Sequence, residues 1–280
     1  MSDGRQESTF KKTLAELYAA HQGKVSHKWS LYIEEYERVL APYREAPIQL
    51  LEIGVQNGGS LELWAQFLPS AEKLVGCDVD PRCAQLRYDD PRIAIIVGNA
   101  NTDATEKSIA EHVPGPNVVI DDGSHQSSDI VRSFARYFPR LMDGGLFVIE
   151  DLHCSYWRDY QGGLSHSLSS MAFIKRLADV MNHEHWGMAK SRTDYLRPFL
   201  KAYKCWIDEE QLARIHSLEL LNSMCVIRKA DPRKNRLGER FIAGKDEPVA
   251  PGHLPLHGSQ NRVPPQRRSP WDVIRSCFRR

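Results

Sequence analysis

The sequence predicts an α/β fold in which a mostly parallel sheet of seven strands is flanked by helices. Three observations predict it. Five short apolar runs alternate with helix-length segments between residues 48 and 149, which is the pattern of βαβ units. These runs are mostly apolar, as in a parallel sheet that is covered on both faces. Two further runs, Ile215–Leu221 and residues 223–228, can add a closing antiparallel pair.

The elements are expected in a regular order along the chain. Two helices come first, over residues 9–21 and 29–43, and Pro47 marks the break after them. The first five strands are expected over residues 48–53, 73–77, 92–97, 117–120 and 145–149. The helical segments that follow each strand are expected over residues 60–67, 81–86, 102–113, 127–141 and 168–185. Residues 152–167, rich in aromatic residues, glycine and serine, are expected to form a loop.

Composition excludes several classes of protein. Of the 280 residues, 41% are hydrophobic and 26% are charged, which is typical of a globular chain and excludes a collagen-like, coiled-coil or wholly disordered one. The net charge of +1 gives no reason to expect a nucleic-acid partner. No stretch approaches the roughly 18 apolar residues of a membrane span, and the N-terminus lacks a signal-peptide core. Six cysteines without a CxxC pair indicate reduced thiols and a cytoplasmic location.

The composition also divides the chain into three parts. Residues 1–46 are expected to be an N-terminal helical segment, and residues 47–229 an α/β domain. Residues 230–280 are expected to be a poorly ordered tail, with a short helix near residues 271–278. This tail holds eleven Lys and Arg against five Asp and Glu, and seven of the sixteen prolines, a composition typical of disorder. It has no aromatic stacking platform, so a solvated or partner-docking arm is favoured over nucleic-acid binding.

A glycine-rich segment follows the first strand. Glycines at a strand-to-helix turn let a ligand approach the backbone, and the next helix offers free N–H groups. The spacing of Gly54 and Gly58 does not match the GxGxxG dinucleotide fingerprint, and Glu52 suits a ligand that carries positive charge. Asp78, at the end of the second strand, can accept both hydroxyls of a ribose. A turn without ligand and a helix N-cap are the alternative interpretations of these two features.

Carboxylates follow the fourth and fifth strands. Because neighbouring parallel strands lie about 4.8 Å apart, Asp122, Glu150 and Asp151 are expected to converge on one edge of the sheet. Grouped carboxylates repel one another unless a cation neutralises them, and oxygen donors favour Mg²⁺ or Mn²⁺ over zinc. His125 is placed to take a proton from a bound hydroxyl group. A solvated turn and an ordinary strand end are the alternatives.

An aromatic segment lies directly after these carboxylates. His153, Tyr156 and Trp157 are followed by two glycines at 162 and 163. Such a loop can stack on a sugar and close over it. It can equally pack as a satellite hydrophobic cluster, and both interpretations stay open.

These motifs resemble those of class I S-adenosylmethionine-dependent methyltransferases, which have a Rossmann-like fold. Residues 122–125 with Glu150 and Asp151 look more narrowly like the metal-dependent sugar O-methyltransferases. That group includes the macrolide-sugar and rhamnosyl O-methyltransferases of antibiotic pathways and relatives in surface-polysaccharide clusters. Residues 58–64 and 155–157 are also similar to it. The resemblance covers about residues 24–190 and does not extend to the tail.

The resemblance implies roles for individual residues. It makes Asp122, Glu150 and Asp151 ligands of Mg²⁺, with Mn²⁺ as the alternative, and His125 the general base. His153, Tyr156 and Trp157 would contact the sugar. The residues implied to contact the cofactor S-adenosylmethionine are Glu52, Gly54, Gly58, Ser60, Asp78, Asn99 and Asp121. Many relatives have an acidic residue where this chain has Asn99, whose amide can still hydrogen-bond the adenine.

The implied activity is Mg²⁺-assisted O-methylation of a sugar hydroxyl, on a surface-glycan precursor or a glycosylated metabolite. A sugar hydroxyl is a poor nucleophile near neutral pH, which explains the need for a cation and a base. The alternatives are a cephalosporin-hydroxylase-like protein, a non-catalytic S-adenosylmethionine-binding protein, and an NAD-dependent oxidoreductase, whose fingerprint is missing. The oligomeric state stays open, with a homo-oligomer among the options.

Overall fold

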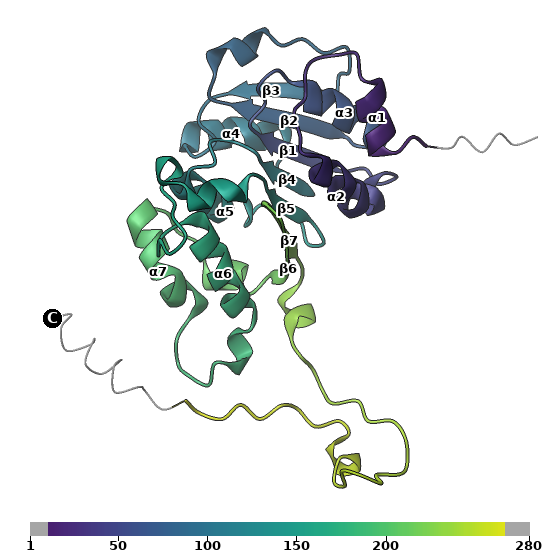
Figure 1. The fold of residues 1–280 in the computed structure, drawn as a ribbon, viewed down its shortest axis with the longest axis vertical. Helices are drawn as coiled ribbons and strands as arrows, with labels where there is room; N and C mark the ends of the chain where they lie inside the picture. Colours follow the sequence, from purple (N-terminus) through teal and green to yellow (C-terminus); the bar gives the residue numbers. More distant parts are fainter. Residues whose placement is uncertain (1–10, 267–280) are drawn as a thin grey trace, which may run out of the picture.

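The computed structural model describes residues 11–266, and a twisted seven-stranded sheet runs through it (Figure 1). The strands are β1 (Gln49–Ile53), β2 (Lys73–Asp78), β3 (Ile93–Val97), β4 (Val118–Asp121), β5 (Leu146–Ile149), β6 (Ile215–Leu221) and β7 (Met224–Lys229). Their order in the sheet is β3-β2-β1-β4-β5-β7-β6. The first five strands are parallel, and β7 is antiparallel to β5 and β6. This architecture confirms the predicted fold class.

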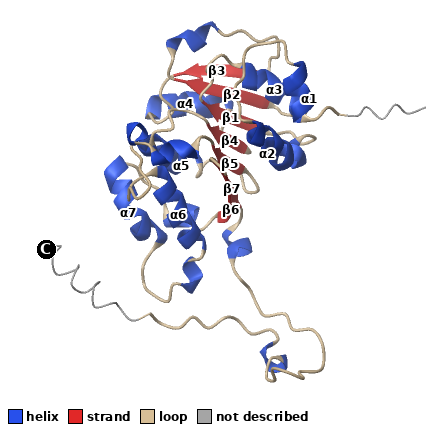
Figure 2. Cartoon of the chain, viewed as in Figure 1, coloured by secondary structure: helices blue, strands red, loops and turns tan. Residues whose placement is uncertain are grey.

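Helices cover both faces of the sheet (Figure 2). On one face lie α1 (Leu14–Ala20), α2 (Ser30–Leu40) and α3 (Gly59–Phe67), and on the other α4 (Asp103–His112), α5 (Ser127–Tyr137), α6 (Ser170–Met181) and α7 (Arg192–Tyr203). Each face has its own core, and alternate strand residues supply the two. Leu50 packs in the core beneath α1 to α3, whereas Leu51 packs in the core beneath α4 to α7, as the twofold period of a strand requires.

Local sequence explains several of the helix boundaries. Thr13 and Glu16 form a capping box at the start of α1, so this helix begins later than the expected residue 9. The helix expected over 127–141 ends at Tyr137, just before Pro139. The expected helix over 81–86 is the 3₁₀ turn Pro81–Gln85. The expected loop over 152–167 contains two 3₁₀ turns, Leu152–Tyr156 and Arg158–Tyr160.

Two helices were not predicted. They are α7 (Arg192–Tyr203) and the single-turn α8 (Glu209–Leu212). Pro198 lies inside α7, and proline normally argues against a helix interior. Leu196, Phe199 and Leu200 are nevertheless buried in the core beneath α4 to α7. Tertiary burial therefore stabilises a helix that its local sequence does not indicate.

The described part of the tail contains little regular structure. Residues 230–266 include two 3₁₀ turns, Pro232–Asn235 and Leu254–Leu256, and an isolated bridge between Glu239 and Gln260. They leave the end of β7 and run away from the sheet (Figure 1). The helix expected near residues 271–278 lies outside the described residues. No helix in the described ranges combines the length and apolarity that crossing a bilayer requires. The division into three parts stays a prediction.

Candidate active site

The predicted site residues gather where the strand order reverses, between β1 and β4. Ile53 at the end of β1 pairs with Asp121 at the end of β4, which in turn pairs with Ile149 at the end of β5. The loops after these three strands therefore start at one level. Open α/β sheets bind ligands at such a switch point, outside the carboxyl ends of their strands.

Three predicted residues form a compact group of metal-ligand type. One donor atom each from Asp122, His125 and Asp151 lies within 4.8 Å of the others, and all three residues are half-buried. His125 Nε2 is 3.6 Å from Asp151 Oδ2. Both residues have positive φ angles, 56° for His125 and 52° for Asp151. These backbone conformations turn the two side chains toward each other after their strands have ended.

Asp151 is held in place by the start of α2. The indole Nε1 of Trp29 donates to Asp151 Oδ1 at 3.1 Å. The Tyr32 hydroxyl lies 3.0 Å from the same oxygen and accepts the Asp151 backbone N–H at 3.0 Å. It also lies 2.9 Å from the carbonyl of Ser223 on the other side. The orientation of this carboxylate thus depends on residues more than a hundred positions away, none of which the sequence analysis identified.

Glu150 lies at the same edge but has different partners. Its side chain is buried, and Oε1 accepts from Lys28 Nζ at 2.6 Å and from the Tyr36 hydroxyl at 2.6 Å. Burial raises the pKa of Glu150, and the neighbouring Lys28 opposes that rise. Glu150 is therefore outside the group of Asp122, His125 and Asp151, and its expected role as a metal ligand stays a prediction.

Lys28 is a further residue at this site that the sequence analysis missed. Its ammonium lies 2.5 Å from Asp122 Oδ2 and 3.6 Å from Glu52 Oε1, and its side chain is only 3% exposed. Burial alone would lower the pKa of Lys28, but the attraction of the surrounding carboxylates outweighs it and keeps the pKa well above its ordinary value. The one signal in the sequence was indirect: several carboxylates at one edge need a counter-charge.

Glu52 is fully buried at the end of β1. Its Oε2 accepts from the Ser60 hydroxyl at 2.7 Å, whereas its Oε1 has no hydrogen-bond partner among the residues that the structure describes. Burial raises the pKa of Glu52, with Lys28 and Ser60 opposing. A buried carboxylate oxygen without a hydrogen bond is costly, so this atom is suited to a donor that arrives with a ligand.

The glycine loop is closely packed against its surroundings. Gly54 has φ 95°, and a Cβ there would lie 2.0 Å from the backbone oxygen of Asp122. Gly58 has φ 84°, and a Cβ there would lie 2.1 Å from the hydroxyl of Tyr88. Only glycine satisfies both the positive φ and the close approach. The loop after β1 thereby comes directly against the carboxylates after β4.

Asp78 fastens this loop to the end of β2. Its Oδ2 accepts the backbone N–H groups of Val55 at 2.7 Å and Gln56 at 3.0 Å, and its Oδ1 accepts that of Asp80 at 2.9 Å. Asp80, not Asp78, is the N-cap of the following turn, so the N-cap interpretation of Asp78 is wrong.

Two other predicted cofactor contacts differ in environment. Asn99 is exposed, and its Oδ1 accepts the Asn101 N–H at 2.9 Å. Asp121 is buried, which raises its pKa to about 7, and its Oδ2 has no hydrogen-bond partner within residues 11–266. The structure tests neither cofactor role, and both stay predictions.

The aromatic segment lies beside Asp151 and extends further than predicted. The rings of His153 and Trp157 meet edge-on at 4.9 Å, and the ring of Trp29 is 6.1 Å from His153. Trp29 and Trp157 remain 51% and 50% exposed, and Tyr156 is also exposed. These side chains are therefore not sealed into a hydrophobic cluster, which favours the sugar-stacking interpretation.

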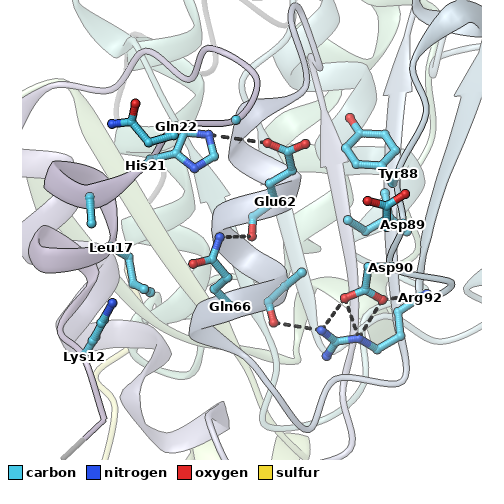
Figure 3. Close-up of a pocket in the computed structure, with 14 residues that line it drawn as sticks. Lys12, Leu17, His21, Gln22, Glu62, Gln66, Tyr88, Asp89, Asp90 and Arg92 are labelled. Carbon is cyan, nitrogen blue, oxygen red and sulfur yellow. Dashed lines mark hydrogen bonds and ion pairs between the residues drawn. The ribbon is translucent and has the colours of Figure 1, made fainter.

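A separate hollow lies on the surface beside α1 and α3, away from the candidate site (Figure 3). Its volume is about 550 Å³, and α1, α3 and residues 88–93 line it. Two of its charged side chains have ion-pair partners, Arg92 with Asp90 at 2.6 Å and Glu62 with Lys24 at 2.6 Å. None of the predicted site residues lines this hollow, so it is not part of the candidate active site.

The known proteins that this chain resembles are methyltransferases, the class that the site residues predict. Residues 51–152 match the family model described as "Methyltransferase domain". The 8-demethyl-8-alpha-L-rhamnosyl tetracenomycin-C 2'-O-methyltransferase of Streptomyces olivaceus is 34% identical over 171 residues, which are 58% of this chain and 44% of that protein. The mycinamicin VI 2''-O-methyltransferase of Micromonospora griseorubida is 33% identical over 163 residues, 55% of this chain and 40% of that protein.

A solved methyltransferase structure also resembles this chain. The MycE methyltransferase of the mycinamycin biosynthetic pathway, in complex with Mg, SAH and mycinamycin VI, superposes with a TM-score of 0.65 and 27% identity, over 80% of this chain and 55% of that one. The chain spans less than half the length of the two curated relatives. Over residues 51–152 the chain matches a methyltransferase domain, and it resembles the S-adenosylmethionine-dependent sugar O-methyltransferases.

Proposed function

We propose that this chain transfers the methyl group of S-adenosylmethionine to a sugar hydroxyl of a glycosylated acceptor, with the help of a divalent cation. The observation that carries the proposal is the approach of His125 to Asp122 and Asp151 at the ends of β4 and β5. The group combines a base and anionic oxygens beside the buried Glu52. The relatives named as O-methyltransferases of rhamnosyl and macrolide compounds support it.

The residues present fit the cofactor. S-adenosylmethionine has a cationic sulfonium and an ammonium group, and Oε1 of Glu52, which accepts no hydrogen bond within residues 11–266, is a buried acceptor for such a charge. Gly54 and Gly58 let the loop pack directly against Asp122 and Tyr88, which brings it beside the carboxylates. Asp78, at the neighbouring strand end, is the candidate partner of the ribose hydroxyls.

The donor set also fits Mg²⁺. Carboxylate oxygens are the ligands that hard cations prefer, and Asp122 and Asp151 present them within one compact group. The Lys28 ammonium lies against Asp122 and Glu150, so a positive charge already faces these oxygens. A bound Mg²⁺ would supply Lewis acidity that lowers the pKa of a sugar hydroxyl.

In the proposed reaction His125 removes the proton of the acceptor hydroxyl through a ring nitrogen. Asp151 Oδ2, 3.6 Å from Nε2, stabilises the imidazolium that results. The new O–C bond forms as the C–S bond of the cofactor breaks, and S-adenosylhomocysteine leaves. The exposed rings of Trp29 and Trp157 hold the sugar in line with the methyl group. Glu52, opposite, holds the cationic end of the cofactor.

Other features remain predictions. The identity of the acceptor, a place in polysaccharide biosynthesis, a cytoplasmic location, the absence of a nucleic-acid partner and the oligomeric state all rest on the sequence. The match of residues 51–152 to a methyltransferase domain argues against the NAD-dependent oxidoreductase alternative.

Calorimetric titration tests the proposal. S-adenosylmethionine and NAD are titrated separately into the full chain, each with Mg²⁺ and with EDTA. We expect S-adenosylmethionine to bind and NAD not to bind. Rhamnosides and other glycosides are then incubated with the protein, S-adenosylmethionine and Mg²⁺, and mass spectrometry follows the gain of one methyl group. Failure of S-adenosylmethionine to bind under either condition would overturn the proposal.

A further inference from the structure

The segment between α1 and α2 crosses directly over the candidate site. The carbonyl of Val25 accepts the Gly59 N–H at 3.2 Å, so the segment lies on the glycine loop. The Lys24 backbone and side chain both donate to Glu62 on α3, at 2.8 and 2.6 Å. At the other end, Trp29 donates to Asp151. Lys28 lies between these two anchored points.

The segment delivers a single ammonium group into the carboxylates. Lys28 Nζ contacts Asp122 Oδ2 at 2.5 Å, Glu150 Oε1 at 2.6 Å and Glu52 Oε1 at 3.6 Å. The carboxylates of Asp122 and Glu150 come from different strand ends, and the ammonium links them. A divalent cation bound by both carboxylates would have to take up much of the space that Nζ fills.

Charge explains why a cation is present at all. Glu52 and Glu150 are fully buried and Asp122 partly buried, and carboxylates so close together repel one another strongly unless a positive charge compensates them. Lys28 supplies that charge from within the chain. A metal ion would supply it from outside. The two sources of charge are therefore alternatives for the same oxygens.

On the basis of the metal-assisted function proposed above, we propose that Lys28 is an internal competitor of the divalent cation, which must displace its ammonium from Asp122 and Glu150 in order to bind there. Two consequences follow. Lys28 stabilises the metal-free protein, and metal affinity depends on where the segment over the glycine loop lies. Since such coupling is reciprocal, a ligand that moves this segment also changes metal binding.

Metal titration of variants tests the inference. Lys28→Met removes the ammonium and keeps most of the side chain, and Lys28→Gln retains a hydrogen-bond donor without charge. Lys107→Met is the matched control, because Lys107 is an exposed lysine on α4, outside both the segment and the carboxylate group. Mn²⁺ and Mg²⁺ are titrated calorimetrically into the full chain without cofactor. We expect both Lys28 variants to bind metal more tightly than wild type, on the order of tenfold, and Lys107→Met to behave like wild type.

Stability gives a second readout on the same proteins. Without metal, Lys28→Met should melt at a lower temperature than wild type, and saturating Mg²⁺ should raise its melting temperature more than that of wild type. Unchanged or weaker metal affinity in the folded Lys28 variants would overturn the inference. Absence of metal binding in every protein would overturn it together with the metal part of the proposed function, and S-adenosylmethionine binding by those samples would show whether the methyltransferase assignment survives.

A measurement on wild type covers the case in which neither Lys28 variant folds. Reductive methylation labels free lysine amines, and peptide mass spectrometry quantifies each site. We expect Lys28 to be protected without metal and to react faster with saturating Mg²⁺, while labelling of the exposed Lys107 on α4 stays constant. Equal protection of Lys28 under both conditions would contradict displacement.

Discussion

His125 and Asp151 meet across the ends of two adjacent strands, with His125 Nε2 3.6 Å from Asp151 Oδ2. Both residues have a left-handed backbone, with φ angles of 56° and 52°. Such a conformation costs a residue with a side chain roughly 1–3 kcal/mol and is retained only where the surroundings enforce it. Here the enforced conformation brings a base and a carboxylate together beside the glycine loop.

Replacement of His125 by Gln should abolish most of the activity. The amide cannot take a proton from the acceptor hydroxyl, so we expect kcat to fall by about 10²- to 10⁴-fold. The affinity for S-adenosylmethionine should not change, because His125 lies on the acceptor side. Acceptor-dependent release of S-adenosylhomocysteine measures the rate, and His166→Gln, an exposed histidine in the following loop, is the control. A variant with wild-type kcat would exclude His125 as the base.

Removal of metal and replacement of Asp151 should have related effects. Asp151→Asn keeps the shape of the side chain but loses its charge, and we expect metal affinity to fall by at least about tenfold. EDTA should abolish turnover of the wild type, and added Mg²⁺ should restore it. Calorimetry with Mn²⁺ measures the affinity. Asp159→Asn, an exposed carboxylate nearby, should bind metal as wild type does, and equal affinities for all three proteins would contradict the assignment.

Gly54 and Gly144 have similar backbone conformations but different surroundings, so alanine variants of the two distinguish backbone strain from a steric clash. Gly54 and Gly144 have φ angles of 95° and 87°, but a Cβ at Gly54 would lie 2.0 Å from Asp122 O, whereas one at Gly144 meets nothing within 4 Å. Gly144→Ala should therefore cost about 1 kcal/mol in the free energy of unfolding. Gly54→Ala should cost several times more, roughly 3 kcal/mol, and weaken cofactor binding. Urea unfolding and calorimetry check this; equal losses in both variants would show that contact with Asp122 is unimportant.

The aromatic surface beside Asp151 should govern acceptor binding. Trp157→Ala removes a half-exposed ring that meets His153 edge-on at 4.9 Å. We expect the KM for a glycosylated acceptor to rise roughly fivefold, which is about 1 kcal/mol of lost aromatic contact, with cofactor affinity unchanged. Trp206→Ala removes a more exposed ring on a different part of the surface and is the control. A KM that rises equally in both variants would argue against a sugar-binding role for Trp157.

Lys229 makes stability depend on pH. Its buried ammonium donates to the carbonyls of Phe138 at 3.0 Å and Pro139 at 2.8 Å, and burial lowers its pKa from 10.5 to about 8. Between those two values the unfolded chain binds more protons than the folded one, so stability rises with pH. From pH 7.5 to 9.5 wild type should gain about 1 kcal/mol relative to Lys229→Met, after allowance for solvent screening. Denaturant unfolding of both proteins at the two pH values measures this; a constant difference would contradict it.

The local pattern of the sequence was sufficient for the sheet and for much of the site. Runs of buried residues alternate with helical segments, and this alternation alone predicts βαβ units and the edge at which their loops meet. Asp122, His125 and Asp151 lie within four residues of the ends of β4 and β5, so their convergence could be predicted without any tertiary information. The helix α7 could not be predicted, because Pro198 interrupts its local signal and burial of Phe199 stabilises it.

By itself, then, the sequence determined the fold class, the edge of the sheet that carries the chemistry, and the residues that lie directly after its strands. Only the tertiary structure decided which side chains complete the site. Lys28 meets Asp122 and Glu150 across 94 and 122 positions, and Trp29 meets Asp151 across 122. The physical reason is that contacts over such separations depend on how α2 and the segment before it pack against the sheet, and no local periodicity encodes that packing.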